Sequence, residues 1–140
     1  MDKNEDMDKK RKLDHIGIAV RDIEDAAGAY SLIFGEGSET EHVAREGVKT
    51  KFFKAGETRI ELLESARGES AIAKFIEKRG EGLHHIAIEV SDIAKDMAEL
   101  QERGIIFTKE EPTVGSGGQK VAFIHPKSLK GILLELIERN

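Results

Sequence analysis

The stretch LDHIGIAVRDI at residues 13–23 is repeated, with few changes, as LHHIAIEVSDI at residues 83–93. A shift of 70 residues superposes seven identical residues in these eleven positions. Stacked solenoids repeat at short, regular intervals along the chain, whereas these two copies lie half a chain apart. The sequence therefore predicts an internal duplication.

Each copy has the pattern of a strand that leads into a helix. Between His15 and Val20 large apolar residues alternate with histidine or small residues, which is the period of a half-buried strand. Asp22 is a suitable N-cap for a helix over 23–34, where apolar residues recur at helical spacing. Asp92 takes the same place in the second copy.

The segments after each helix predict further strands and one linking helix. The expected strands are 39–45, 48–55 and 58–64 in the first half, and 105–109, 119–125 and 131–138 in the second, with the linking helix at 70–80. The predicted fold is α+β, with two βαβββ modules at 12–65 and 83–138 that pair in a curved mixed sheet. We expect one domain over 12–140, preceded by a charged, disordered tail at 1–11.

Composition excludes several classes of protein. The chain has no cysteine, which rules out disulfides and thiolate chemistry and fits a cytoplasmic location. Its formal net charge is −5, and no basic block interleaved with aromatic residues is present, so nucleic acid is not an expected partner. No apolar run is long enough for a membrane span, so no membrane partner is expected either.

Four residues in the duplicated pattern are candidate metal ligands. His15 and His85 hold the same position, on the strand face that carries small residues, whereas His84 is expected on the other face or at the edge of the strand. Glu61 and Glu135 lie within the apolar runs TRIELLE and GILLELIE, at corresponding places in the two modules. A carboxylate in such a strand is costly unless it is paired or ligates a metal.

Two imidazoles and two carboxylates form a ligand set suited to a divalent transition ion. Co²⁺, Ni²⁺, Mn²⁺ and Zn²⁺ all accept such ligands, and the two negative charges balance the charge of the ion. Any one of these residues taken alone would be interpreted as structural or ion-paired, and the symmetry of the four is what favours a metal. The sequence leaves open whether the two halves of one chain, or halves of two chains, form the site.

Other polar features give weaker indications. His42 and His125 lie outside the duplicated pattern and are expected to be structural or at the surface. The glycine-rich segment PTVGSGGQK at 112–120 fits neither nucleotide-binding glycine motif. It is either a flexible turn or a loop whose backbone N–H groups approach a substrate.

Together these motifs resemble the vicinal oxygen chelate superfamily, which includes glyoxalase I. The chain resembles in particular the methylmalonyl-CoA epimerase family through DHIGIAV, IELLE, FIEKRGEGLHHIAIEV and GILLELIE. The most specific stretch is GSGGQKVAFIHPKS at 115–128. The resemblance implies an isomerase that acts on a coenzyme A thioester, a homodimer, and one divalent ion per chain, with Co²⁺ expected first.

The resemblance also implies roles for individual residues. His15, Glu61, His85 and Glu135 would hold the metal, and Glu135 would also move the substrate proton. Some epimerases carry a second acid–base glutamate at the position of Thr50, and threonine cannot replace it as a base. The residues implied to contact substrate are Gly117, Gly118, Lys120, Lys127 and Ser128.

Two alternative functions remain open within the same superfamily. Glu61 is glutamine in some epimerases, and a glutamate there resembles the ligand set of glyoxalase I, which acts on a thiol hemithioacetal. The other alternative is a non-catalytic binding protein of the same fold.

Overall fold

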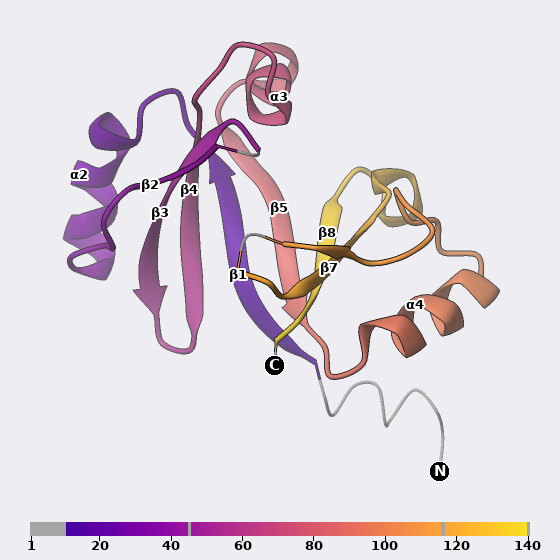
Figure 1. The fold of residues 1–140 in the computed structure, drawn as a ribbon. Coiled ribbons are helices and arrows are strands. Elements are labelled where there is room, and N and C mark those ends of the chain that lie inside the picture. The colour runs from indigo at the N-terminus through magenta and orange to yellow at the C-terminus, as the bar shows by residue number, and fades with distance from the viewer. Residues whose placement is uncertain (1–10, 45, 116, 140) are drawn as a thin grey trace. The chain divides into compact units, whose positions relative to one another are not determined.

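The computed structural model describes residues 11–44, 46–115 and 117–139 (Figure 1). These residues form two compact units, one of residues 15–84 and one of residues 11–14 together with 85–139. Residues 1–10 of the predicted tail lie outside the described part. Each unit repeats the order strand, helix and three further strands, so the predicted α+β fold of two βαβββ modules is confirmed.

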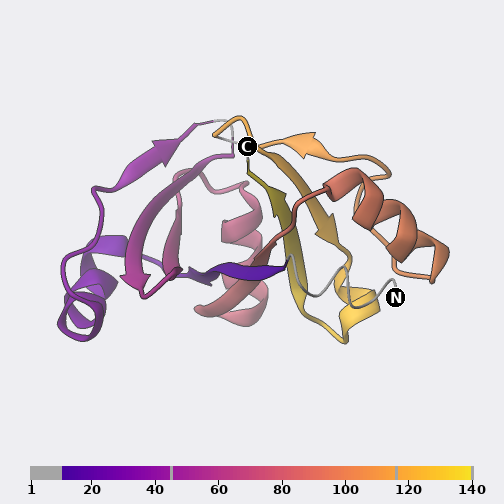
Figure 2. The ribbon, with the colours of Figure 1, turned by 90° about the horizontal axis from the view of Figure 1, so that it is seen from below.

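The first unit is a mixed sheet with one helix on each face. Its elements are β1 (Lys12–Ala19), α2 (Ile23–Phe34), β2 (Glu41–Val43), β3 (Val48–Ala55), β4 (Thr58–Ser65) and α3 (Ala71–Arg79). The strands lie in the order β2-β3-β4-β1, with β1 parallel to β4 and the other pairs antiparallel. Figure 2 shows α2 and α3 on opposite sides of this sheet.

Successive residues of the strands supply the two apolar clusters that hold these helices. Val20, Phe53 and Leu62 pack with Ile23 of α2 on one face. Ala19, Val48 and Leu63 pack with Ile72 of α3 on the other face. Since side chains alternate along a strand, α3 covers only the end of the face that carries His15, near the last residue of β1.

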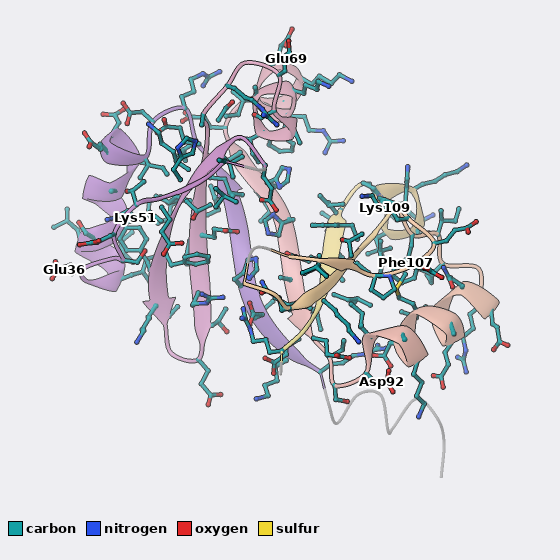
Figure 3. All side chains as sticks on the ribbon, in the orientation of Figure 1. Glu36, Lys51, Glu69, Asp92, Phe107 and Lys109 are labelled. Carbon is teal, nitrogen blue, oxygen red and sulfur yellow. The ribbon has the colours of Figure 1, made fainter. Side chains whose placement is uncertain are left out.

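The second unit has the same plan, and its described residues include no counterpart of α3. Its elements are β5 (Gly82–Glu89), α4 (Ile93–Glu102), β6 (Thr113–Val114), β7 (Lys120–Ile124), the 3₁₀ helix η1 (Pro126–Leu129) and β8 (Leu133–Glu138). The strands lie in the order β5-β8-β7-β6, with β5 parallel to β8. A core of Ile93, Met97, Phe107 and Leu136, among others, lies between α4 and the sheet, and Figure 3 labels Phe107 there.

The predicted helix starts are confirmed. The Asp22 side chain accepts hydrogen bonds from the amides of Glu24 and Asp25 at the start of α2. Ser70 accepts from the amide of Ala73 in α3, and Asp92 accepts from the amide of Lys95 in α4.

One strand prediction is wrong. In place of a strand over 105–109, the structure has a single bridge between Phe107 and Ile124. The strand β6 begins at Thr113, six residues after Phe107. The edge of β7 is therefore paired at two separate points, with the charged segment 109–111 between them. Pro112 has no N–H group, which limits ladder pairing in this segment.

Within the second unit, ion pairs hold residues 11–14 against the rest of that unit. Arg139 donates two hydrogen bonds to the Asp14 carboxylate, of 3.1 and 3.0 Å. Arg11 lies 3.5 Å from the carboxylate of Asp96 in α4. Burial raises the pKa of Asp96 above its ordinary value of 3.8, although Arg11 opposes that rise.

No helix among the described residues is long and apolar enough to cross a membrane.

Candidate functional site

The first unit places His15 beside Glu61. In the parallel pair β1–β4 the partner of Glu61 is Gly17, so Glu61 and His15 share one face of the sheet. The Nε2 atom of His15 lies 3.4 Å from Oε1 of Glu61, and the two side chains are 7% and 12% exposed. A nearly buried imidazole and a nearly buried carboxylate therefore face each other.

The second unit repeats this arrangement with His85 and Glu135. The partner of Glu135 in the parallel pair β5–β8 is Ala87, which again lies two residues after the histidine. Nε2 of His85 is 3.6 Å from Oε1 of Glu135, and the side chains are again 7% and 12% exposed. The duplication seen in the sequence thus extends to strand register, distance and burial.

The donor atoms of each pair fit a divalent transition ion. A usual N–H···O hydrogen bond measures about 2.7–3.2 Å, and both pairs are wider. Two ligands held at about 2.1 Å from one ion lie about 3.0 Å apart at a right angle and about 3.4 Å apart in a tetrahedron. Imidazole nitrogen and carboxylate oxygen are ligands for the ions predicted from the sequence.

Phe52 borders the first pair. Its ring meets the His15 ring edge to face, with centroids 6.1 Å apart and an interplanar angle of 86°. Phe52 is the antiparallel partner of Glu61 and so lies on the same face. It limits the orientations open to the His15 ring and shields the pair on that side.

Thr50 lies on the His15 face, two residues before Phe52 in β3, and is 5% exposed. The residue at this position is therefore directed to the same side of the sheet as the His15–Glu61 pair.

Of the other histidines, His84 and His125 make structural contacts and His42 lies at the surface. The ring of His84 packs edge to face on Phe75 of α3, with centroids 5.0 Å apart, on the opposite side of β5 from His85. The Nδ1 atom of His125 accepts a hydrogen bond from the amide of Lys127 at the start of η1. His42 is exposed in β2 and pairs with Lys49, on the α2 side of its sheet.

The residues implied to contact substrate lie around β7 and η1. Gly117 and Gly118 are in the turn before β7, and Gly118 has a positive φ of 81°. Lys120 pairs with Glu138, 3.9 Å from its carboxylate, and so shares the α4 side of the sheet. The hydroxyl of Ser128 accepts a hydrogen bond of 2.9 Å from the amide of Ile106.

Sequence reasoning missed a second pair of glutamates. Oε1 of Glu64 accepts a hydrogen bond of 2.8 Å from the amide of Ile23, the first residue of α2. Oε1 of Glu138 accepts one of 2.9 Å from the amide of Ile93, the first residue of α4. The signal was present in the repeats ELLE and ELIE, where this second glutamate follows the first by three residues.

The three-residue spacing in ELLE and ELIE places the two glutamates of each repeat on opposite faces of the strand. Residues three apart in a strand lie on opposite faces, so Glu61 faces His15 while Glu64 faces α2. A carboxylate at the first amide of a helix satisfies an otherwise unpaired donor and interacts favourably with the helix dipole. Each last strand therefore carries one glutamate that faces its histidine and one that bonds to the start of the helix in its own module, α2 or α4.

The comparisons with known proteins assign the family. Residues 14–123 match the model of the Glyoxalase/Bleomycin resistance protein/Dioxygenase superfamily. The chain belongs to this superfamily, which confirms the fold predicted from the sequence.

Within the superfamily, the chain is similar to methylmalonyl-CoA epimerases, and the predicted resemblance and isomerase class are thereby confirmed. It is 39% identical to the mitochondrial methylmalonyl-CoA epimerase of Homo sapiens, over 89% of this chain and 72% of that protein. The structure of a methylmalonyl-CoA epimerase in complex with methylmalonyl-CoA and NH4+ has a TM-score of 0.83 at 35% identity, over 92% of this chain and 94% of that one. The crystal structure of a hypothetical protein from Bacillus halodurans C-125 has a TM-score of 0.88 at 46% identity, over 93% and 95% of the two chains.

Proposed function

We propose that this protein is a metal-dependent epimerase that interconverts (2R)- and (2S)-methylmalonyl-CoA. The observation that carries the proposal is the repeated pair of a nearly buried histidine and glutamate, at 3.4 and 3.6 Å in the two units. The similarity to named epimerases over most of the chain supplies the substrate class.

In this proposal His15, Glu61, His85 and Glu135 together hold one divalent ion per chain. Co²⁺ is the expected ion, and Ni²⁺, Mn²⁺ and Zn²⁺ suit the same ligands. When bound, such an ion supplies positive charge that stabilises negative charge developing on the substrate oxygens. The two carboxylates offset the charge of the ion itself.

Glu135 is the proposed proton carrier. The C2–H bond of the substrate breaks, the proton passes to a carboxylate oxygen of Glu135, and the electron pair moves into the thioester carbonyl. Return of a proton to the opposite face of C2 inverts that centre. Thr50 lies on the His15 face but has no group that accepts a proton at neutral pH, so the acid–base role proposed for that position in some epimerases falls to another group.

The remaining parts of the proposal concern partners. The substrate is a coenzyme A thioester, contacted by residues around β7 and η1. The protein forms a homodimer, and light scattering after size-exclusion chromatography would measure the mass of that dimer. The proposed contact residues are Gly117, Gly118, Lys120, Lys127 and Ser128.

Exchange of the C2 proton with solvent deuterium tests the activity. We expect methylmalonyl-CoA to take up deuterium at C2 with metal-loaded protein, and chelation to abolish the uptake until metal is restored. Glu135→Gln should remove the activity, while Glu138→Gln, in the same strand but facing α4, should keep most of it. Loaded protein that leaves the C2 proton in place would overturn the proposal.

Glu61 favours a second candidate function, a glyoxalase I-type lyase that acts on a thiol hemithioacetal. Formation of lactoylthiol from methylglyoxal and a thiol would support this lyase. Deuterium uptake into methylmalonyl-CoA without lactoylthiol formation would eliminate it.

A further inference from the structure

Arg59 lies beside the His15–Glu61 pair and is neither a proposed metal ligand nor a proposed substrate contact. It is the β4 partner of His15 in the parallel register and precedes Glu61 by two residues. Its side chain therefore belongs to the same face of the sheet as both.

The guanidinium of Arg59 is held over the ring of Phe52. Its central carbon lies 4.3 Å from the ring centroid, which is the distance of a stacked cation–π contact. The same Phe52 ring also makes the T-shaped contact with the His15 ring. One aromatic side chain thus positions both the candidate ligand and the cation next to it.

A second cation lies at the same end of this face. Lys54 of β3 is the antiparallel partner of Arg59, next to the turn between β3 and β4. By contrast, α3 packs on this face at the other end of β1, near Ala19 and Leu63. Positive charge is therefore concentrated at the end of the face that α3 does not cover.

This placement suits the recognition of an anion. A planar guanidinium carries its N–H donors in its own plane, where they match two oxygens of a carboxylate or phosphate. The contact with Phe52 restrains the guanidinium and so reduces the entropy lost on binding. The chain has a formal net charge of −5, so attraction of an anionic substrate depends on local cations of this kind.

We propose that Arg59 binds an anionic group of the thioester substrate, either its free carboxylate or a phosphate of coenzyme A. This inference rests on the proposed epimerase function. Arg59 then favours substrates that carry a negative charge on the acyl group or on coenzyme A. The four proposed metal ligands, which include Glu135, carry out the chemistry.

The test compares Arg59→Met with Arg59→Lys and with Lys51→Met. Methionine keeps an apolar contact with Phe52 but removes the charge, and lysine keeps the charge but not the planar donors. Lys51→Met is the matched control, since Lys51 lies in the same strand as Phe52 on the α2 side, where its ammonium donates to the carbonyl of Ser38 (Figure 3). Each variant is assayed for C2 deuterium exchange, metal content and thermal melting.

We expect Arg59→Met to raise KM by at least about tenfold with little change in kcat, the size expected for a lost hydrogen bond to a charged group. Arg59→Lys should fall between Met and wild type, and Lys51→Met should match wild type. Methylmalonyl-pantetheine, which lacks the coenzyme A phosphates, separates the two sources of the anion. The defect persists with this substrate if Arg59 binds the carboxylate, and disappears if it binds a phosphate.

Two results would overturn the inference while wild type is active. One is an unchanged KM for Arg59→Met, and the other is loss of bound metal in that variant, which would make Arg59 a support for the His15–Glu61 pair. Wild-type protein without exchange activity would refute the proposed function. Calorimetric titration of wild type and Arg59→Met with methylmalonyl-CoA would then still test the inference, because equal affinities would reject it.

Discussion

Replacement of Glu64 by alanine should destabilise the protein, because it removes the carboxylate that accepts a hydrogen bond from the first amide of α2. The bond from the amide of Ile23 to Oε1 of Glu64 measures 2.8 Å, and Ile23 is only 1% exposed. Without Glu64 this amide loses its acceptor in a place that water reaches poorly.

The size of the effect follows from these contacts. A hydrogen bond to a charged group contributes about 1.5–3 kcal/mol, and its position at a helix start is favourable for a negative charge. Lys49 lies 3.7 Å from the same carboxylate but is 46% exposed, so this pair adds no more than about 0.5 kcal/mol. We therefore expect Glu64→Ala to lower the free energy of unfolding by about 2 kcal/mol, and Glu64→Gln, which keeps one acceptor oxygen, by about 1 kcal/mol.

Denaturant unfolding of the metal-free protein measures this loss without a contribution from bound metal. Glu138→Ala is a second test, since Glu138 caps α4 at 2.9 Å and pairs with Lys120 at 3.9 Å. Lys49→Ala is the control for the ion pair, and a double-mutant cycle with Glu64→Ala isolates the coupling between them. A loss of less than about 0.5 kcal/mol for Glu64→Ala, or an equal loss for Lys49→Ala, would refute the reasoning.

Two further predictions concern metal binding and pH. His85→Ala should bind metal at least about tenfold more weakly than wild type, as judged by titration with Co²⁺, because it removes a proposed ligand, whereas His84→Ala should retain normal affinity. Unchanged affinity in His85→Ala would argue against the proposed ligand set. For Asp96, burial raises the pKa in the folded protein above its ordinary value of 3.8, so the folded state binds this proton more tightly than the unfolded state. The contribution of Asp96 to the free energy of unfolding is fully present at a pH below its ordinary pKa. This contribution is lost as pH rises through the pKa of Asp96 in the folded protein. Wild type should therefore lose stability relative to Asp96→Asn as the pH of the unfolding experiment rises from acid to neutral, and a difference that is constant with pH would contradict the raised pKa.

Local patterns allowed most of the elements to be predicted. Asp22, Ser70 and Asp92 mark helix starts because a side-chain oxygen must satisfy amides in the first turn. The alternation around His15 and His85 fixes which residues share a face, so the sequence alone predicts which histidine joins each pair.

The features that could not be predicted depend on contacts between distant residues. The bond from Ile23 to Glu64 spans 41 residues, and the bond from Ile93 to Glu138 spans 45. Apolar residues such as Ile105 and Phe107 suggest a continuous strand, but pairing there is set by the edge of β7 and by the charged segment that ends at Pro112. The contact between Arg59 and Phe52 depends in the same way on the register of β3 with β4.

The hydrogen bond from the amide of Ile23 to Glu64 also favours the register of β4 against β1 on which the His15–Glu61 pair depends. If β4 slipped by one residue against β1, Glu61 would turn toward α2 and Glu64 toward His15, since every side chain would change face. That register would lose the hydrogen bond to the amide of Ile23 and would place Leu62 beside His15, away from the apolar cluster that it forms with Phe53. The glutamate that fixes the helix thereby ensures that the other glutamate meets the histidine. The same spacing in ELIE favours the register of β8 against β5 in which Glu135 faces His85, because Glu138 then accepts the hydrogen bond from the amide of Ile93.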